Sequence, residues 1–165
     1  MWPQLVPGEV RVIDDVSKLS GPVLAAVGFS AQPEKRDIQF TFFTAPHGHN
    51  FMIADPCCGE TGKGAALFEM NNAVIKPVDL VMGDPRLGFT SQGLADDIQV
   101  DDGAVAVRSR VGFSDCEDGD WGYYYRFDDG DRLTLMSVID TGCAHIGVRE
   151  LYHAKNIDVG KWWMH

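Results

Sequence analysis

The chain has 165 residues, 45% of them hydrophobic and 23% charged, which is typical of one globular domain and excludes a disordered or coiled-coil protein. Its 14 Lys and Arg residues stand against 24 Asp and Glu residues, giving a formal net charge of -10. A surface of this charge repels a nucleic-acid backbone and favours a basic protein as the partner.

The first residues and the apolar runs give an expectation about location. Residues 1–5 carry neither the basic cluster nor the apolar stretch of a signal peptide. No apolar run approaches the roughly 18 residues that a membrane-spanning helix needs, so no membrane partner is expected. We expect a cytoplasmic protein, with a periplasmic location as the alternative if a signal peptide has been removed.

Gly and Pro residues cut the chain into short segments rich in Val, Ile, Phe, Tyr and Thr, a pattern typical of strands joined by turns. One short helical turn is predicted over 15–21, and 59–73 is either a loop or a short helix. We expect a single mainly β domain over 1–165, an antiparallel sandwich or strongly twisted sheet of roughly eight to ten strands with little helix. The predicted strands are 10–13, 23–29, 38–44, 51–54, 78–81, 98–100, 104–113, 121–127, 132–139 and 145–153.

Two Asp-Gly pairs predict hairpins, because both residue types tolerate the positive φ of a tight turn. Asp102-Gly103 joins the strands on either side of it. A two-residue turn at Asp129-Gly130 places Tyr125 opposite Thr134 and Trp121 opposite Val138. The same register, carried further, sets two cysteines opposite each other, where a disulfide would staple a secreted binding module. Buried or free thiols are the alternative for the four cysteines, which are Cys57, Cys58, Cys116 and Cys143.

His47, His49, Cys57 and Cys58 are of the residue types that bind zinc. Structural zinc sites usually separate paired cysteines by two to four residues, and these two cysteines are adjacent. A pair of solvated histidines at a hairpin tip is therefore preferred, and we expect neither metal nor cofactor. A metal- or cysteine-dependent enzyme centred on these four residues is the alternative function.

Two loop motifs are weak matches to ligand-binding loops. The glycine-rich run 59–64 has Gly64 after its lysine, where a phosphate loop needs Ser or Thr. The run 115–120 lacks the alternating oxygen ligands and the bidentate Glu of an EF-hand calcium loop. Surface turns account for both.

Acidic residues and aromatic residues cluster in the same region. The acidic clusters 96–97, 101–102, 115–120 and 128–131 are either turn residues or one acidic face that attracts a basic protein. The alternating aromatics of 121–127 are either core or an exposed binding surface. The candidate partner-binding residues are Asp115, Glu117, Asp118, Asp120, Asp128, Asp129 and Asp131 for charge, with Trp121, Tyr123 and Tyr125 as anchors.

Four motifs in the second half of the chain occur in a characteristic order and spacing: Gly83-Asp84-Pro85, then 98–105, 124–127 and 156–161. In this respect the chain resembles small bacterial β-rich inhibitor or immunity proteins that neutralise lysozyme-like toxins delivered by secretion systems. The resemblance implies stoichiometric inhibition of a cognate toxin rather than catalysis. Val159 departs from the Thr usual in that group, and the lipid-attachment cysteine is missing, which favours a toxin that acts inside the cell.

Overall fold

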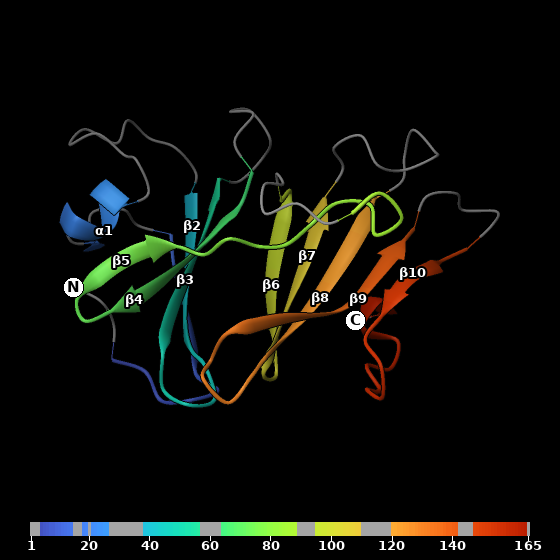
Figure 1. The fold of residues 1–165 in the computed structure, drawn as a ribbon. Coiled ribbons are helices and arrows are strands. Elements are labelled where there is room, and N and C mark those ends of the chain that lie inside the picture. Colours follow the sequence, from blue (N-terminus) through green and yellow to red (C-terminus); the bar gives the residue numbers. More distant parts are fainter. Residues whose placement is uncertain are drawn as a thin grey trace. The chain divides into compact units, whose positions relative to one another are not determined.

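The computed structural model describes residues 4–14, 18–19, 21–26, 38–56, 64–88, 95–109, 120–141 and 147–164. The chain divides into two compact units, residues 1–78 and 79–165. Each unit contains a five-stranded sheet whose strands follow one another in chain order (Figure 1). Every neighbouring pair is antiparallel, so both sheets are simple meanders.

The first unit packs apolar side chains on both faces of its sheet. On one face Phe40 and Phe42 are fully buried and pack with Leu19 and Val23, which come from the segment between the first two strands of the sheet. Phe43 points to the opposite face because side chains alternate along a strand, and it stacks on Phe51 at a centroid distance of 5.5 Å. The elements are β1 (Val10–Ile13), α1 (Gly21–Ala26), β2 (Ile38–Thr44), β3 (Asn50–Pro56), β4 (Ala66–Asn71) and β5 (Val74–Pro77).

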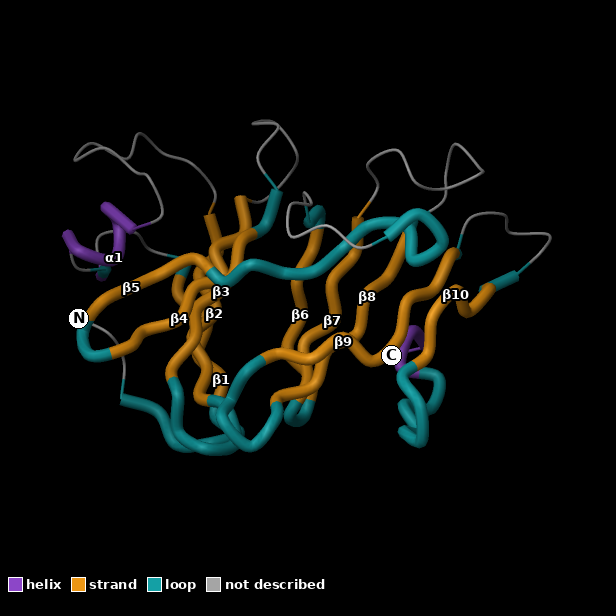
Figure 2. Tube along the Cα trace, viewed as in Figure 1, coloured by secondary structure: helices purple, strands orange, loops and turns teal. Residues whose placement is uncertain are grey.

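Figure 2 shows the strands of the second unit, whose sheet is likewise apolar on both faces. One face carries the Trp121 side of the central strand. On the other face Tyr124 packs with Met136 and with Val159 of the C-terminal segment, which runs back across the sheet after the last strand. The elements are β6 (Asp97–Asp101), β7 (Ala104–Ser109), β8 (Trp121–Phe127), β9 (Leu133–Asp140), β10 (Arg149–His153) and the 3-10 helix η2 (Trp162–Met164).

The predicted fold class is confirmed: the protein is mainly β with little helix, and its two five-stranded antiparallel sheets are what a β-sandwich requires. The strands predicted over 10–13, 38–44 and 121–127 have the predicted bounds. The Asp102-Gly103 hairpin is also confirmed, with Asp101 paired to Ala104. The expectation of one domain over the whole chain stays a prediction.

Three local predictions in the first half are wrong. The sequence predicts a strand over 23–29, but residues 21–26 form α1, because Leu and Ala residues favour helix. Val23 is buried against the sheet. Residues 78–81 belong to no strand; the strand there ends at Pro77. Within the predicted loop or helix of 59–73, the chain forms most of a hairpin that turns at Asn72-Ala73, with φ of 49° and 66°.

The predicted register of the hairpin between β8 and β9 is also wrong. Tyr125 pairs with Leu135 and Trp121 with Asp140, because the turn holds three residues and a bulge follows Tyr124. The Asp131 N–H donates to the Asp128 carbonyl at 3.0 Å, and Asp131 adopts φ of 55°, so aspartate rather than glycine takes the left-handed position. The premise for a bridge between Cys116 and Cys143 is thereby lost, and both cysteines lie outside the described residues.

Candidate functional site

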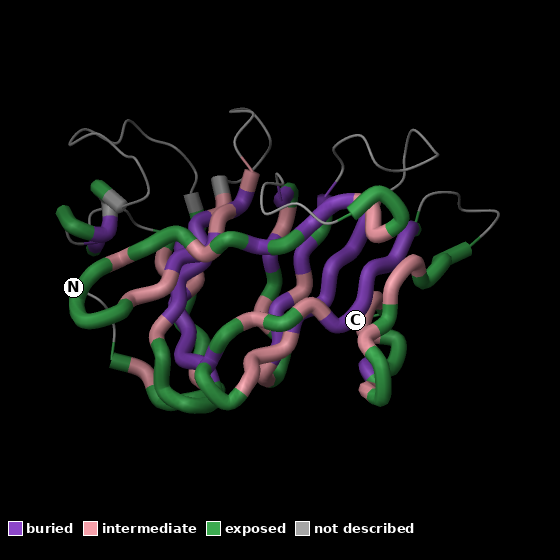
Figure 3. The backbone as a smooth tube through the Cα atoms, viewed as in Figure 1, coloured by how far each residue is buried: buried purple, intermediate pink, exposed green. Residues whose placement is uncertain are grey.

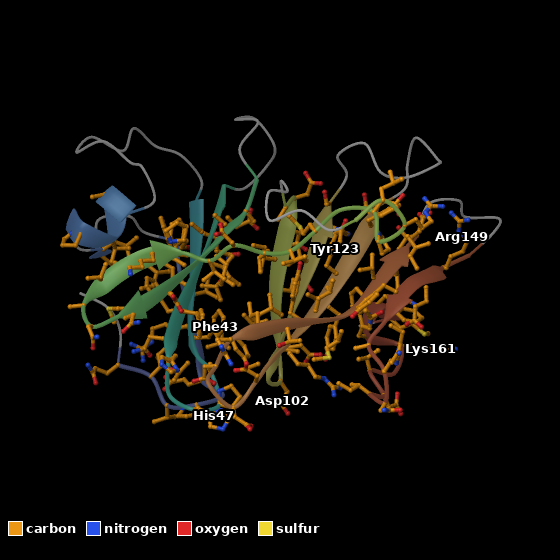
Figure 4. All side chains as sticks on the ribbon, viewed as in Figure 1. Phe43, His47, Asp102, Tyr123, Arg149 and Lys161 are labelled. Carbon is orange, nitrogen blue, oxygen red and sulfur yellow. The ribbon has the colours of Figure 1, made fainter. Side chains whose placement is uncertain are left out.

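The proposed aromatic anchors belong to the interior of the protein. Trp121, Tyr123 and Tyr125 are 1%, 0% and 2% exposed. Figure 3 colours most of the second sheet's central strand as buried, and Figure 4 labels Tyr123 on that sheet. Of the two interpretations of this stripe, core is correct and an exposed binding surface is wrong. The physical reason is that side chains on both faces of the second sheet are buried, so the alternation along β8 places Tyr124 in the interior as well, and only Phe127 at the end of the strand is half-buried.

Two of these tyrosines attach the segment after the first unit to the second sheet. The Tyr123 hydroxyl donates to the Gly83 carbonyl at 3.2 Å and accepts from the Gly83 N–H at 3.0 Å. The Tyr125 hydroxyl donates to the Val81 carbonyl. Burial raises the pKa of both phenols, and both remain neutral donors at physiological pH. These side chains therefore hold the fold and do not serve as partner contacts.

The predicted acidic residues are divided between the two ends of β8. Asp120 precedes the strand and Asp128 follows it, and eight steps along the strand at about 3.3 Å each separate them by roughly 26 Å. Asp115, Glu117 and Asp118 lie outside the described residues. The prediction of one acidic face is therefore wrong for Asp120 and Asp128, which lie at opposite ends of the strand.

Two aspartates of the β8–β9 turn, Asp128 and Asp131, have structural roles. The Asp128 carboxylate accepts the N–H groups of Gly130 at 2.8 Å and Arg132 at 2.9 Å, and it forms an ion pair with the Arg132 side chain at 3.1 Å. These hydrogen bonds, above all that from the Arg132 N–H, lower the pKa of Asp128. Asp131 is only 3% exposed. Among the described residues, Asp129 is therefore the one predicted carboxylate of this turn that is exposed and makes none of the turn's hydrogen bonds.

The fold brings two Asp-rich turns together at one end of the second sheet. Ala104 pairs with Arg126, and the Phe127 N–H donates to the Gly103 carbonyl at 3.4 Å, so the β6–β7 and β8–β9 turns are neighbours. Asp102 is labelled at the tip of the first turn in Figure 4. Within the described parts of the chain, the exposed carboxylates of this end without an ion pair are Asp101, Asp102 and Asp129. We call these three residues the acidic end.

At the opposite end, three adjacent strands present charges on the face that carries Tyr124. Arg108 of β7 lies between two carboxylates. Its Nη2 atom is 3.8 Å from Asp97 Oδ2, and its Nε atom is 3.5 Å from Asp120 Oδ2. Asp97 also accepts a hydrogen bond of 2.9 Å from Gln99. Arg108 thus contacts a carboxylate on each side of it.

Asp120 is fixed in this position through its backbone. The Thr141 hydroxyl accepts from the Asp120 N–H at 3.1 Å and donates to the Asp120 carbonyl at 2.8 Å, and the Thr141 N–H donates to the same carbonyl at 2.9 Å. Three hydrogen bonds thus close the end of the β8–β9 ladder. The carboxylate of Asp120 is presented from a rigid point of the sheet.

Two tryptophans of η2 form walls beside these charges. Trp162 stacks on Tyr124 with ring centroids 5.1 Å apart and planes 21° apart. Trp163 meets Trp162 edge-on, at 5.9 Å and 82°. Gly122 provides the space for Trp162, since a Cβ atom there would lie 2.7 Å from the ring carbon Cη2.

Together these residues enclose a pocket of about 230 Å³ on the second unit. Both charged side chains and aromatic rings line it. We call it the Trp pocket, and its lining residues include Asp97, Arg108, Asp120, Gly122, Trp162 and Trp163.

The histidine and cysteine cluster is only partly described. His47 and His49 are exposed at the β2–β3 turn, as predicted for a hairpin tip, and Figure 4 labels His47 there. Cys57 and Cys58 lie outside the described residues. Within the described ranges, no three His, Cys, Asp or Glu side chains come together in a way that could hold a metal ion.

Sequence reasoning missed the Trp pocket. The pairing of Asp97 with Arg108 follows directly from the register of the Asp102-Gly103 hairpin, so the sequence could have predicted that half of the pocket. Trp162 and Trp163 are adjacent tryptophans in the sequence, but only the return of the C-terminal segment across the sheet brings them to Gly122. No short-range pattern encodes that packing.

In the part of the chain that is described, no helix is both long and apolar enough to span a membrane. Comparisons of the sequence and structure with known protein families, with curated proteins and with solved structures find no match.

Proposed function

We propose that this protein is an inhibitor of the immunity type, which binds a basic bacterial toxin or effector protein through acidic surfaces of its second unit. The observation that carries the proposal is the acidic end. Asp101, Asp102 and Asp129 meet there, exposed and without an ion pair among the described residues. The resemblance of residues 83–161 to bacterial inhibitor proteins supplies the class of partner.

The physical basis of this function is charge complementarity. The chain carries a net charge of -10, and exposed carboxylates on a rigid sheet raise the rate at which a basic partner is captured. Blocking a toxin requires binding in a one-to-one complex and no turnover. Exposed charges of this kind act mainly on the association rate and on its dependence on salt.

The test begins with the full chain immobilised and exposed to lysate of its source organism at low and moderate salt. Captured proteins are identified by mass spectrometry, and the captured protein is then assayed with increasing amounts of the chain. We expect a basic partner whose capture weakens with salt and whose activity falls to zero at one equivalent. A partner that keeps its activity at saturation, or the absence of any salt-sensitive partner, would overturn the proposal.

A matched pair of variants locates the surface. D102N/D129N removes two charges from the acidic end, whereas D14N/D79N removes two exposed charges elsewhere. We expect the first pair to slow association with the captured partner severalfold and the second to leave it nearly unchanged. Equal effects of the two pairs would show that net charge matters and the acidic end does not.

A further inference from the structure

We propose that two copies of this chain associate through the edge of the first sheet, with β1 of one copy pairing antiparallel to β1 of the other about a two-fold axis. Within the described residues, β1 pairs with β2 and with no other strand, so every second residue directs its N–H and C=O groups to an open side. The pairing joins the two first sheets into one continuous sheet. This association does not depend on the proposed function, because β1 belongs to the first unit and the acidic end to the second.

The segment around β1 exposes apolar side chains to the solvent. Val6, Val10 and Val12 are 66%, 48% and 52% exposed, and residues 4–14 are all described. Val10 and Val12 share one face of β1, because side chains alternate along a strand. A cluster of exposed apolar side chains, unlike a single one, is typical of an interaction site.

The other three sheet edges carry features that discourage pairing with a further strand. β5 ends in Pro77, which has no N–H to donate. β6 has Asp97 and Asp101 at its two ends, and full antiparallel pairing of two copies would set these like charges against each other. β10 has a bulge between Glu150 and Tyr152. By contrast, β1 contains no proline and pairs regularly with β2 over all 4 residues, so it is the edge best suited to a further strand.

The charges of this segment fit a second copy of the same strand. Glu9 and Arg11 share one face, with Glu9 Oε1 and Arg11 Nη2 3.2 Å apart. In an antiparallel pair centred on Val10, Glu9 of each copy lies opposite Arg11 of the other, so two ion pairs form between the copies. A pair centred on Arg11 would instead set the two Arg11 side chains against each other, which is destabilising. Charge therefore selects both the occupant of the edge and its register.

Arg11 can change partners at little cost. The Arg11 and Glu9 side chains are 49% and 40% exposed, and an ion pair so exposed to water is weak. Glu9 Oε2 accepts the Val6 N–H at 3.3 Å and fixes the turn before β1, whereas Oε1 faces Arg11. Oε1 can therefore bond Arg11 of the second copy while the turn stays intact. One short strand from each copy makes a small interface, which is typical of a weak and transient dimer.

The test measures self-association of the full chain by sedimentation velocity, from about 10 µM to about 1 mM. A reducing agent prevents disulfides between copies, since the chain has 4 cysteines. Salt at about 0.15 M screens the long-range repulsion between two chains of net charge -10. We expect the average mass to rise with concentration from that of one chain towards that of two.

A matched pair of lysine variants identifies the edge. Val10 and Val74 are 48% and 51% exposed, and they lie on the two opposite edge strands of the same sheet. V10K sets two lysines against each other at the centre of the β1 pair and should weaken dimerisation about five-fold or more. V74K makes the same change in charge on β5 and should leave dimerisation unchanged.

Charge reversal identifies the occupant as a second copy. R11E and E9R each leave like charges opposite one another, so each variant alone should lose the dimer, even though E9R makes the chain less negative overall. An equal mixture of the two variants should associate, because the acidic side chains of one then face the basic side chains of the other.

Three results would overturn the inference. They are a chain that stays monomeric at the highest concentration, equal weakening by V10K and V74K, and a mixture of R11E and E9R that associates no better than either variant alone. Thermal unfolding of each variant separates lost association from lost folding. E9R also loses the hydrogen bond to the Val6 N–H, and if it unfolds early, the comparison of V10K with V74K decides. None of these results involves the toxin, so the capture experiment remains an independent test of the proposed function.

Discussion

Trp162 occupies the space that a side chain at Gly122 would need. The ring carbon Cη2 would lie 2.7 Å from a Cβ atom at position 122, and Ile139 Cγ1 would lie 2.9 Å from it. The Trp162 ring, which stacks on Tyr124, thus fills the space beside β8 that the missing side chain of Gly122 leaves open. The C-terminal segment can lie flat on the sheet only because of this glycine.

The first prediction concerns this fit. G122A should lower the free energy of unfolding by about 1–3 kcal/mol, the usual cost of forcing an extra group into a packed site. G130A is the control, since a Cβ atom there would meet nothing closer than 3.5 Å. Urea denaturation of the two variants measures the difference. Similar midpoints for both would mean that Trp162 can move aside at no cost.

The second prediction concerns the buried hydroxyl of Tyr123. Y123F removes both hydrogen bonds to Gly83 and leaves a buried N–H without its partner, which typically costs about 1–3 kcal/mol. Y124F is the control, because the Tyr124 hydroxyl has no hydrogen bond within the described residues. Thermal and urea unfolding should separate the two variants. If Y124F is destabilised as much as Y123F, the attachment of the segment at Gly83 does not matter for stability.

The third prediction concerns the Asp128 turn at low pH. The pKa of Asp128 is lowered in the folded protein by its hydrogen bonds to the N–H groups of Arg132 and Gly130. Its contribution to stability is therefore fully present above the ordinary pKa of 3.8 and is lost as the pH falls through the lower, folded value. D128A should flatten the loss of thermal stability in acid and should lower the unfolding temperature at neutral pH. D129A, with the neighbouring exposed carboxylate removed, should do neither.

The fourth prediction concerns His153, whose ring joins β10 to the C-terminal segment. One ring nitrogen contacts Glu150 at 3.2 Å, and the other contacts the Ile157 carbonyl. The hydrogen bond to Glu150, followed by that to Ile157, raises the pKa of His153 above its ordinary value of 6.5, because only the protonated ring donates from both nitrogens.

The resulting stabilisation by His153 is fully present below pH 6.5 and is lost as the pH rises through the raised, folded value. The unfolding temperature of the wild type should therefore fall as the pH rises above 6.5, and H153Q should lack this fall. E150Q should shift it to lower pH. A wild-type curve that matches H153Q throughout would contradict the assignment.

Much of the second sheet could be predicted from the sequence because its information is local. The alternation over 121–127 predicts β8 at its observed bounds, and Asp102-Gly103 predicts the turn between β6 and β7. The second Asp-Gly pair was misleading for a physical reason. The Asp128 carboxylate binds the N–H groups of Gly130 and Arg132 and so stabilises a three-residue turn in place of a two-residue one.

The candidate sites depended on information that is not local. The stripe of Trp121, Tyr123 and Tyr125 is compatible with either face of a strand being buried, and the hydrogen bonds that cover it come from the distant segment around Gly83. In the same way, the Trp pocket exists because Trp162 returns to Gly122, 40 positions earlier in the chain. Residue types suggested an acidic, aromatic binding protein, but only packing shows which acids and which aromatics reach the surface.

The order of the strands bears on how the chain acquires its structure during synthesis. All five strands of the first sheet lie within residues 10–77, and each pairs only with its neighbours in the sequence. The ribosome therefore releases a complete set of partners for that sheet before any strand of the second has been made, and domains generally fold as units in this way. The second sheet closes later, and the Trp pocket forms only after Trp162 and Trp163 have left the ribosome.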